Sequence, residues 1–319
     1  MSTATEPDDD EARGPLQRWV RDAIQNPQKV YRALFYSATG FFLVTTLFPF
    51  YWLLVLALTP RELMTQFSFP PTPNGFNPES FITVFQQEPF HLYVFNSFVL
   101  AIVTTVIVIF IASLAGYVFG RLEFPGRGPL MLGILAISYF PPAAFVVPLF
   151  RVFTGRTPVE IPFVDLVLFQ PPRLLNTPGS MILPFSALFM PLSIFILTTF
   201  YAQIPDGLED AARVEGTTRI GALFRVIMPL SAPGVATAAV LTFISVYNEY
   251  FFSSIMALSN EPSQWSPLVG GILSYQTQYA TAYDLMAAAS IIGVLPVVIL
   301  VVIAQERIVS GLTAGALKE

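Results

Sequence analysis

Side chains that could do chemistry are few in this chain of 319 residues. It has no cysteine, a single histidine (His91) and two lysines, Lys29 and Lys318. The chain therefore offers no thiol nucleophile and no thiolate metal ligand. It also lacks the glycine-rich P-loop pattern and a lysine to complete it, so any ATP hydrolysis belongs to another chain. We expect no catalytic residue, no cofactor and no metal site, and hence a protein that is not an enzyme.

A charged segment rich in small residues, 202–233, lies between two long apolar runs. Its pattern predicts two amphipathic helices joined at Gly216. Pro205 suits the first helical position, and acidic residues fall near the positive end of the helix dipole: Asp206, Glu209 and Asp210. Residues spaced i, i+3, i+4 and i+7 predict one nearly flat face that another protein could approach closely: Leu208, Ala211, Ala212 and Glu215.

The second helix of this segment begins after Gly216, where either Thr217 or Thr218 can cap it. Its apolar stripe is formed by Ile220, Leu223, Phe224 and Ile227. Arg219 and Arg225 lie off that stripe, and the helix closes at Pro229 and Pro233. We therefore expect a charged helical hairpin that lies outside the lipid.

A second polar stretch lies inside the apolar run 234–258 and comprises Tyr247, Asn248, Glu249 and Tyr250. An ionisable residue within a membrane span is costly and is a candidate for function. Two interpretations of Glu249 remain open. In the first, Glu249 contacts a polar solute or lines the gate. In the second, it satisfies a polar network at the interface with a neighbouring helix.

The elements that must position these two stretches are long apolar helices. Hydrophobic residues make up 54% of the chain and charged residues only 12%, about half the charge of an ordinary soluble domain. A helix of about 20 apolar residues crosses a bilayer. Six runs meet or approach that length: 31–59, 93–119, 130–150, 179–201, 234–258 and 284–304. The fold class is therefore all-α, a polytopic integral membrane protein with six transmembrane helices.

Prolines and polar loops divide this membrane core. Pro141, Pro142 and Pro148 break the third run, and the freed carbonyls indicate either a plain kink or a helix facing a wet pathway. Three loops are expected outside: 60–92; 151–178 with a short helix on or dipping into the membrane surface; and 259–283, which can contact a partner. The organisation is a tail (1–30, with a short helix near Trp19), a first span and loop (31–91), a core (92–304) and a second tail (305–319).

The distribution of basic residues predicts the orientation. With a cytoplasmic N-terminus, twelve of the sixteen lysines and arginines lie on the cytoplasmic side and four outside: Arg61, Arg151, Arg156 and Arg173. This bias follows the positive-inside rule and places both termini and the hairpin 202–233 in the cytoplasm. The chain is expected in the cell membrane, and nothing in it indicates a nucleic-acid partner.

The hairpin resembles the cytoplasmic loop of the membrane-spanning permeases of binding-protein-dependent ABC importers, which carries an EAA signature, a glycine and a downstream isoleucine followed by Pro-Leu. The matching residues are Asp210, Ala211, Ala212, Gly216, Ile227, Pro229 and Leu230. Asp210 replaces the usual glutamate, although Glu209 precedes it, and Glu215 stands where aspartate is common. The resemblance implies that ATPase coupling involves Glu209, Asp210, Ala211, Ala212, Glu215 and Gly216.

Other segments resemble the same family. The turn at 120–129 is similar to its short basic turn, and Tyr247 to Tyr250 resemble its aromatic-Asn-Glu-aromatic sequence, with tyrosine in place of tryptophan. The end of the chain resembles the pattern of the carbohydrate-uptake (maltose-type) branch through Gly311, Leu312, Gly315, Ala316 and Lys318. About twenty residues before the Leu-Leu-Asn-Thr stretch at 174–177 look like an insertion.

The resemblance implies a type I ABC importer permease fold and a role as one half of the translocation pathway for a sugar or similar small polar solute. Its implied partners are a second homologous permease, a cytosolic ABC ATPase dimer, an external solute-binding protein and the lipid bilayer. The alternative is an ion-coupled secondary transporter that acts without an ATPase. Such a transporter would be expected to carry several ionisable residues deep in its spans, whereas Glu249 stands nearly alone.

Overall fold

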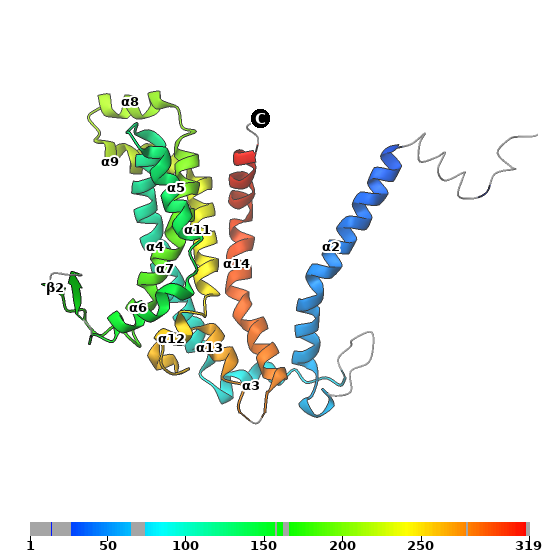
Figure 1. Ribbon diagram of the computed structural model, residues 1–319. Coiled ribbons are helices and arrows are strands. Elements are labelled where there is room, and N and C mark those ends of the chain that lie inside the picture. Colours follow the sequence, from blue (N-terminus) through cyan, green and yellow to red (C-terminus); the bar gives the residue numbers. More distant parts are fainter. Residues whose placement is uncertain are drawn as a thin grey trace, which may run out of the picture.

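The computed structural model describes residues 27–64, 74–156, 158–161, 166–278 and 280–316, together with residue 14. The predicted helix near Trp19 lies outside the described residues. Within them the chain is a bundle of long helices with one small sheet (Figure 1). The long helices are α2 (Pro27–Leu58), α4 (Phe90–Arg121), α7 (Gly179–Tyr201), α11 (Ala232–Tyr247) and α14 (Tyr283–Ala316).

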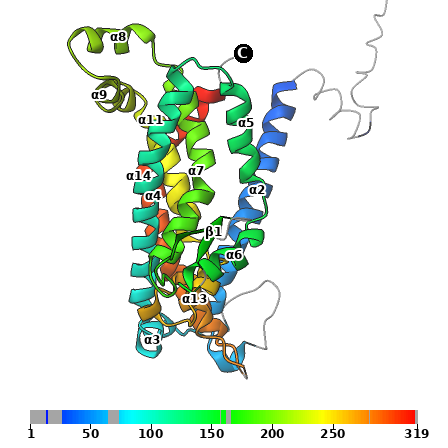
Figure 2. The same cartoon turned by 60° about the vertical axis from the view of Figure 1, so that its left-hand side comes forward.

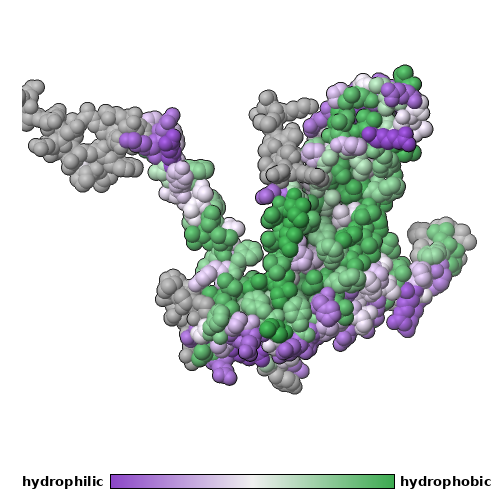
Figure 3. Space-filling view, turned by 180° about the vertical axis from the view of Figure 1, so that it is seen from behind, coloured by the Kyte–Doolittle hydropathy of each residue, from purple (hydrophilic) through white to green (hydrophobic). Residues whose placement is uncertain are grey.

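Four described helices are long and apolar enough to cross a membrane, namely α2, α4, α7 and α14. The number rises to six when each of two bent helix pairs is one span. Figure 3 shows the corresponding surface, a broad apolar band with hydrophilic residues gathered at both ends. The all-α, polytopic fold class predicted from the apolar runs is confirmed.

The first bent pair is α5 (Arg127–Ser138) and α6 (Ala143–Phe153), which meet at an angle of 84°. Pro141 and Pro142 lie in the break, as the sequence predicted. Proline lacks a backbone N–H and clashes with the preceding turn, so the helix cannot continue through this pair. α6 consequently turns across the bundle (Figure 2).

The second bent pair joins the hairpin to α11. The helical segment 219–230 meets α11 at 86°. α11 ends at Tyr247, so the predicted fifth span (234–258) is wrong at its C-terminal end. The reason is local, because the backbone N–H groups of Phe252 and Ser253 donate to the Glu249 carboxylate instead of continuing the helical ladder. A separate one-turn helix, α12 (Ser253–Met256), follows.

The insertion within 151–178 is a β-hairpin, so the short helix expected there is wrong. Strands β1 (Val159–Ile161) and β2 (Leu166–Phe169) pair antiparallel, with Val159 opposite Phe169. Apolar and β-branched runs this short, with prolines nearby at 158, 162 and 171, favour strands over a helix. This β-hairpin extends sideways from the bundle beyond α6 (Figure 1).

The polar loops at the end of the bundle opposite the hairpin 202–233 contain short helices. The first contains a 3-10 turn (Arg61–Leu63) and α3 (Ser80–Gln87). The segment 259–283 contains a 3-10 turn (Pro262–Gln264) and α13 (Leu268–Leu273), and it folds back on the bundle rather than standing free. Its Tyr275 hydroxyl donates to the Val84 carbonyl of α3 at 2.6 Å.

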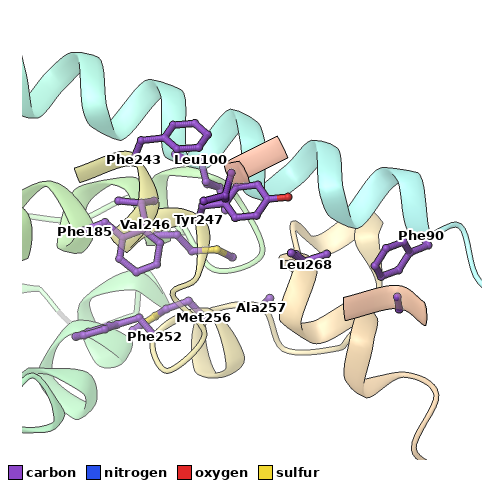
Figure 4. Close-up of a cluster of buried hydrophobic side chains, with 14 of the residues drawn as sticks. Phe90, Leu100, Phe185, Phe243, Val246, Tyr247, Phe252, Met256, Ala257 and Leu268 are labelled. Carbon is purple, nitrogen blue, oxygen red and sulfur yellow. The ribbon is translucent and has the colours of Figure 1, made fainter. Parts of the chain in front are cut away.

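Two groups of buried apolar side chains hold the bundle together. The first lies towards the end of the bundle opposite the hairpin 202–233 and joins α4, α7, α11 and α12 (Figure 4), with Tyr247, Phe185 and Phe252 among its fully buried residues. The second lies beside the hairpin, where Leu223 and Ile227 pack on α4 and α7 with Leu197, Tyr201 and Tyr117. The second cluster fixes the hairpin to the membrane core.

The two outermost long helices lie apart at the hairpin end of the bundle. α2 approaches α14 at the end of the bundle opposite the hairpin 202–233 and leans away from the bundle towards its own N-terminus (Figure 1). Most of its side chains are exposed, and only Val55 and Ala57 are buried. α14 continues as a helix to Ala316, beyond the predicted span 284–304 and through most of the predicted tail. The start of α2 and the end of α14 lie at the same end of the molecule as the hairpin.

Candidate functional site

The first half of the hairpin is α8 (Asp206–Val214), which begins and ends where the sequence predicted to within one residue. Pro205 has an extended conformation (ψ 136°) and stands just before the helix. Asp206 and Glu209 occupy its first turn, where carboxylates complement the helix dipole. Gly216 adopts a φ of 92°, a left-handed conformation that glycine takes without steric cost, and so ends this half of the hairpin.

The second half is made of α9 (Arg219–Ala222), a π-helical turn (Leu223–Ile227) and α10 (Met228–Leu230). Of the two predicted caps, Thr218 is the one used, because its hydroxyl accepts from the Gly221 N–H at 3.1 Å. The predicted apolar stripe divides in two. Leu223 and Ile227 are buried, while Ile220 is exposed.

One face of α8 is exposed although it carries apolar and small side chains. Val214 is 89% exposed and Leu208 45%. Four of the six residues predicted to couple to an ATPase lie in the open with them, and Ala212 is half-buried. The four exposed residues are Asp210, Ala211, Glu215 and Gly216. This surface, Leu208, Ala211, Val214 and Glu215, is called the α8 face below.

Glu209, the sixth predicted residue, points the other way and is buried. Its Oε1 accepts a hydrogen bond from the Tyr117 hydroxyl at 2.5 Å, and its Oε2 accepts from Arg121 Nε at 3.1 Å. Both partners belong to the last turn and a half of α4, far away in the sequence. Glu209 therefore attaches α8 to a membrane-spanning helix of its own chain.

Arg121 is the centre of this attachment, and its side chain is only 4% exposed. Besides Glu209, it contacts Asp206 Oδ1 at 2.9 Å and donates to the carbonyl of Ile204, just before α8. The guanidinium thus bonds to the segment entering the helix, to its first residue and to its fourth. We call Tyr117, Arg121, Asp206 and Glu209 the α4–α8 clamp.

In the sequence, Arg121 stands out only as part of a short basic turn, and the pattern does not identify Tyr117. A signal was nevertheless present, because an arginine directly at the end of an apolar span has carboxylates as natural partners. The two carboxylates that bind it lie about ninety residues later in the chain. Their contact with Arg121 arises from the tertiary fold and cannot be predicted from residue spacing within the hairpin.

The second candidate stretch, Tyr247 to Tyr250, does not act as one group. Tyr247 is fully buried, and its hydroxyl donates to the Gly293 carbonyl of α14 at 2.9 Å. Asn248 is exposed and donates to the Ile244 carbonyl within its own helix. Within the part of the chain that the structure describes, no hydrogen bond joins these four side chains to one another.

Glu249 satisfies backbone groups of the turn that follows α11. Its carboxylate accepts from the N–H of Phe252 at 2.9 Å and from the hydroxyl of Ser253 at 3.1 Å, with a longer contact to the Ser253 N–H. These contacts support the structural interpretation of Glu249, with the difference that its partners are local and not on a neighbouring helix. The half-buried Tyr250 follows it in the same turn.

Known proteins resemble this chain over most of its length. Residues 112–313, which include the hairpin, match the family model described as binding-protein-dependent transport system inner membrane component. The sulfoquinovosyl glycerol transport system permease of Agrobacterium fabrum is 37% identical over 90% of this chain and 94% of its own length. The trehalose transport system permease of Mycobacterium tuberculosis is 32% identical over 85% of this chain and 92% of its own.

A solved structure has the same fold. A chain of a bacterial ABC transporter involved in the import of the polysaccharide alginate superposes with a TM-score of 0.71 at 16% identity, over 88% of this chain and 98% of that one. The family match covers well over half of the sequence, and its region contains both the exposed α8 face and the buried Glu209. The chain therefore belongs to the family of inner membrane components of binding-protein-dependent transport systems.

Proposed function

We propose that this chain is one permease half of an ATP-driven importer for a sugar or similar small polar solute. The observation that carries the proposal is the α8 face, an exposed surface of small and apolar side chains held on the membrane core by the buried Arg121. An exposed apolar surface outside the membrane commonly marks a site where a partner protein binds. A separate ABC ATPase is the partner that the family membership supports.

The relatives support the class of solute. Their names include a sulfoquinovosyl glycerol permease and a trehalose permease, both concerned with sugars or sugar conjugates. This chain's own solute is proposed to belong to the same class. Its partners would be a second, homologous permease, an ATPase dimer on the cytosolic side and a solute-binding protein outside.

The proposed orientation puts the hairpin and both termini in the cytoplasm. The twelve-to-four bias in basic residues supports it. The start of α2 and the end of α14 lie at the hairpin end of the molecule, as an even number of spans requires. In this orientation α3, α13 and the 259–283 segment face the binding protein.

The transport cycle is a switch between two states of the permease pair. ATP binding draws the two ATPase subunits together, and each α8 moves with the subunit docked on it. Because α8 is clamped to α4, the movement reaches the membrane helices and exchanges outward for inward opening. Nucleotide shifts this equilibrium only by the amount that it binds one state more tightly than the other.

Purification of the tagged chain from its native membrane in mild detergent tests the assembly. An ABC ATPase and a second permease should co-purify with it. For each tagged chain we expect two ATPase subunits and one second permease. Under the alternative, an ion-coupled secondary transporter, the chain would purify without an ATPase and still transport its solute after reconstitution.

A further inference from the structure

Among the four described helices that are long enough to cross a membrane, α4 alone has no proline. α2 contains Pro49, α7 contains Pro184 and Pro191, and α14 contains Pro296, whereas the 32 residues of α4 contain none. A proline removes one hydrogen bond of the helical ladder and creates a place where the helix bends. At 1.5 Å per residue, α4 is an uninterrupted rod about 48 Å long, enough to cross a bilayer completely.

The cytoplasmic end of this rod is bonded to the hairpin. The α4–α8 clamp joins Tyr117 and Arg121 to Asp206 and Glu209 through three side-chain contacts of 2.5 to 3.1 Å. The side chain of Arg121 is buried and charged. If it separated from Asp206 and Glu209, its desolvation penalty would no longer be offset by ion pairs. α8 and the end of α4 therefore move together.

The external end of the rod is bonded to the segment 260–268, which leads into α13. The Tyr93 hydroxyl donates to the Asn260 carbonyl at 2.5 Å. Asn96 Nδ2 donates to the carbonyls of Pro262 and Ser266 at 2.8 and 3.0 Å. The Ser97 hydroxyl accepts from the Leu268 N–H at 2.8 Å. All three α4 side chains are buried: Tyr93, Asn96 and Ser97.

These four hydrogen bonds hold backbone that makes few regular hydrogen bonds of its own. The segment 260–268 is a 3-10 turn and two connections, so the α4 side chains satisfy three of its carbonyls and one of its N–H groups. The position of the segment thus depends on the position of α4. In the proposed orientation it lies at the external end, where the solute-binding protein approaches.

We propose that α4 is the element that transmits movement between the cytoplasmic hairpin and the external segment 260–268. Arg121 and Asn96 are positioning residues at its two ends, and neither needs to contact ATP or solute. The proposal rests on the proposed function, because it assumes an ATPase on the α8 face and a binding protein outside. It specifies one helix of the bundle as the link between them.

The test uses the complete complex in proteoliposomes and compares ATP hydrolysis with and without solute-loaded binding protein. The ratio of these two rates measures communication across the membrane, which a purely structural role would not change. Arg121→Ala and Asn96→Leu should each lower the ratio at least about fivefold, the lower end of typical coupling between sites. Basal hydrolysis and ATPase co-purification should persist in Asn96→Leu, because Asn96 lies at the end of α4 away from the α8 face.

Matched variants separate transmission from folding. Arg225→Ala changes an exposed arginine of the same hairpin whose side chain makes no hydrogen bond or ion pair with the described residues, and its ratio should stay at the parental value. Tyr93→Phe and Tyr117→Phe remove one hydroxyl each without removing the ring, and they serve if either larger change prevents assembly. Each should lower the ratio by a smaller factor than the corresponding larger change.

The double variant gives the decisive result. If one rod links the two ends, breaking the second end adds little, so Arg121→Ala with Asn96→Leu should match the more severe single variant. If the ratio in the double variant instead falls by the product of the two single-variant factors, the two ends act independently and the proposal is overturned. A parental ratio in either single variant would also overturn it. Absence of an ATPase from the parental complex would instead refute the proposed function itself.

Discussion

At the scale of single residues, Ala211 is the position where the proposed docking surface can be tested with least risk to the fold. It is exposed on the α8 face, so a larger side chain there meets no part of its own chain. Ala211→Trp should block close approach of a partner. Overpacking a tight contact costs roughly 1 to 3 kcal/mol, which weakens binding about tenfold or more.

The measurement is the amount of ATPase that co-purifies with equal amounts of tagged permease. Glu123→Trp is the matched control, because it adds the same ring to an exposed cytoplasmic turn outside the hairpin. It should leave the bound ATPase unchanged. Parental ATPase recovery with Ala211→Trp would show that the α8 face is not the docking surface.

Glu249 is predicted to act through hydrogen bonding and not through charge. Glu249→Gln keeps an oxygen that can accept from Phe252 or Ser253, so most solute uptake should remain. Glu249→Leu leaves two N–H groups unpaired, at about 1 to 3 kcal/mol for each buried group. It should lower both thermal stability in detergent and uptake. Equal loss of uptake in the two variants at normal expression would mean that the negative charge itself is needed.

Adjacent residues of the signature show where sequence reasoning stops at this scale. The spacing correctly predicts α8 and the terminating Gly216, since caps and charges are local signals. It does not distinguish Glu209 from Asp210, which have similar chemistry and opposite environments. Glu209 is buried because Arg121 of α4 lies beneath it, whereas Asp210 points outward and pairs with Arg213 at 3.7 Å.

At the scale of elements, the contact between α4 and α7 beside the hairpin depends on a glycine. A Cβ at Gly116 would lie 2.9 Å from Cβ of Leu197, closer than side chains approach, whereas a Cβ at Gly133 of α5 would meet nothing within 4 Å. Gly116→Ala should therefore lower the melting temperature of the purified complex. Gly133→Ala should leave it unchanged or raise it, because alanine is the better helix former.

These two substitutions are identical in chemistry and differ only in their surroundings. If both raise the melting temperature, α4 and α7 are not in tight contact beside the hairpin. If both lower it, the effect belongs to the helices themselves rather than to their packing.

Elements followed the sequence where their ends are marked by local chemistry. The proline pair at 141–142 predicted the break between α5 and α6, and the apolar run 179–201 predicted α7 residue for residue. The fifth span ended early because Glu249 captures backbone donors, which hydropathy does not register. The β-hairpin at 159–169 was missed because its strands have only three and four residues, although the prolines around them already disfavour a helix.

At the scale of the whole molecule, the absence of native cysteine makes topology directly measurable. Phe76→Cys places a thiol at an exposed site of the first external loop, and Val214→Cys places one on the α8 face. A membrane-impermeant maleimide should label the first in intact cells. It should label the second only after permeabilisation. Labelling of both from the same side would contradict the six-span arrangement.

The sequence predicted the class of molecule better than its assembly. Composition and apolar run lengths suffice for a polytopic helical fold, because a bilayer imposes one length scale on every span. The open position of α2, whose side chains are mostly exposed, could not be predicted, because helix orientation within a bundle depends on packing partners. The same holds for the clamp, which depends on two segments meeting across the fold.

The measurement that tests the central claim most directly is solute uptake into proteoliposomes that contain the purified complex, with solute-loaded binding protein outside. We predict uptake against a gradient when ATP is enclosed with the ATPase and no uptake without ATP. Collapsing proton and sodium gradients with ionophores should leave the rate unchanged. Uptake driven by an imposed ion gradient in the absence of ATP would contradict the account and favour a secondary transporter.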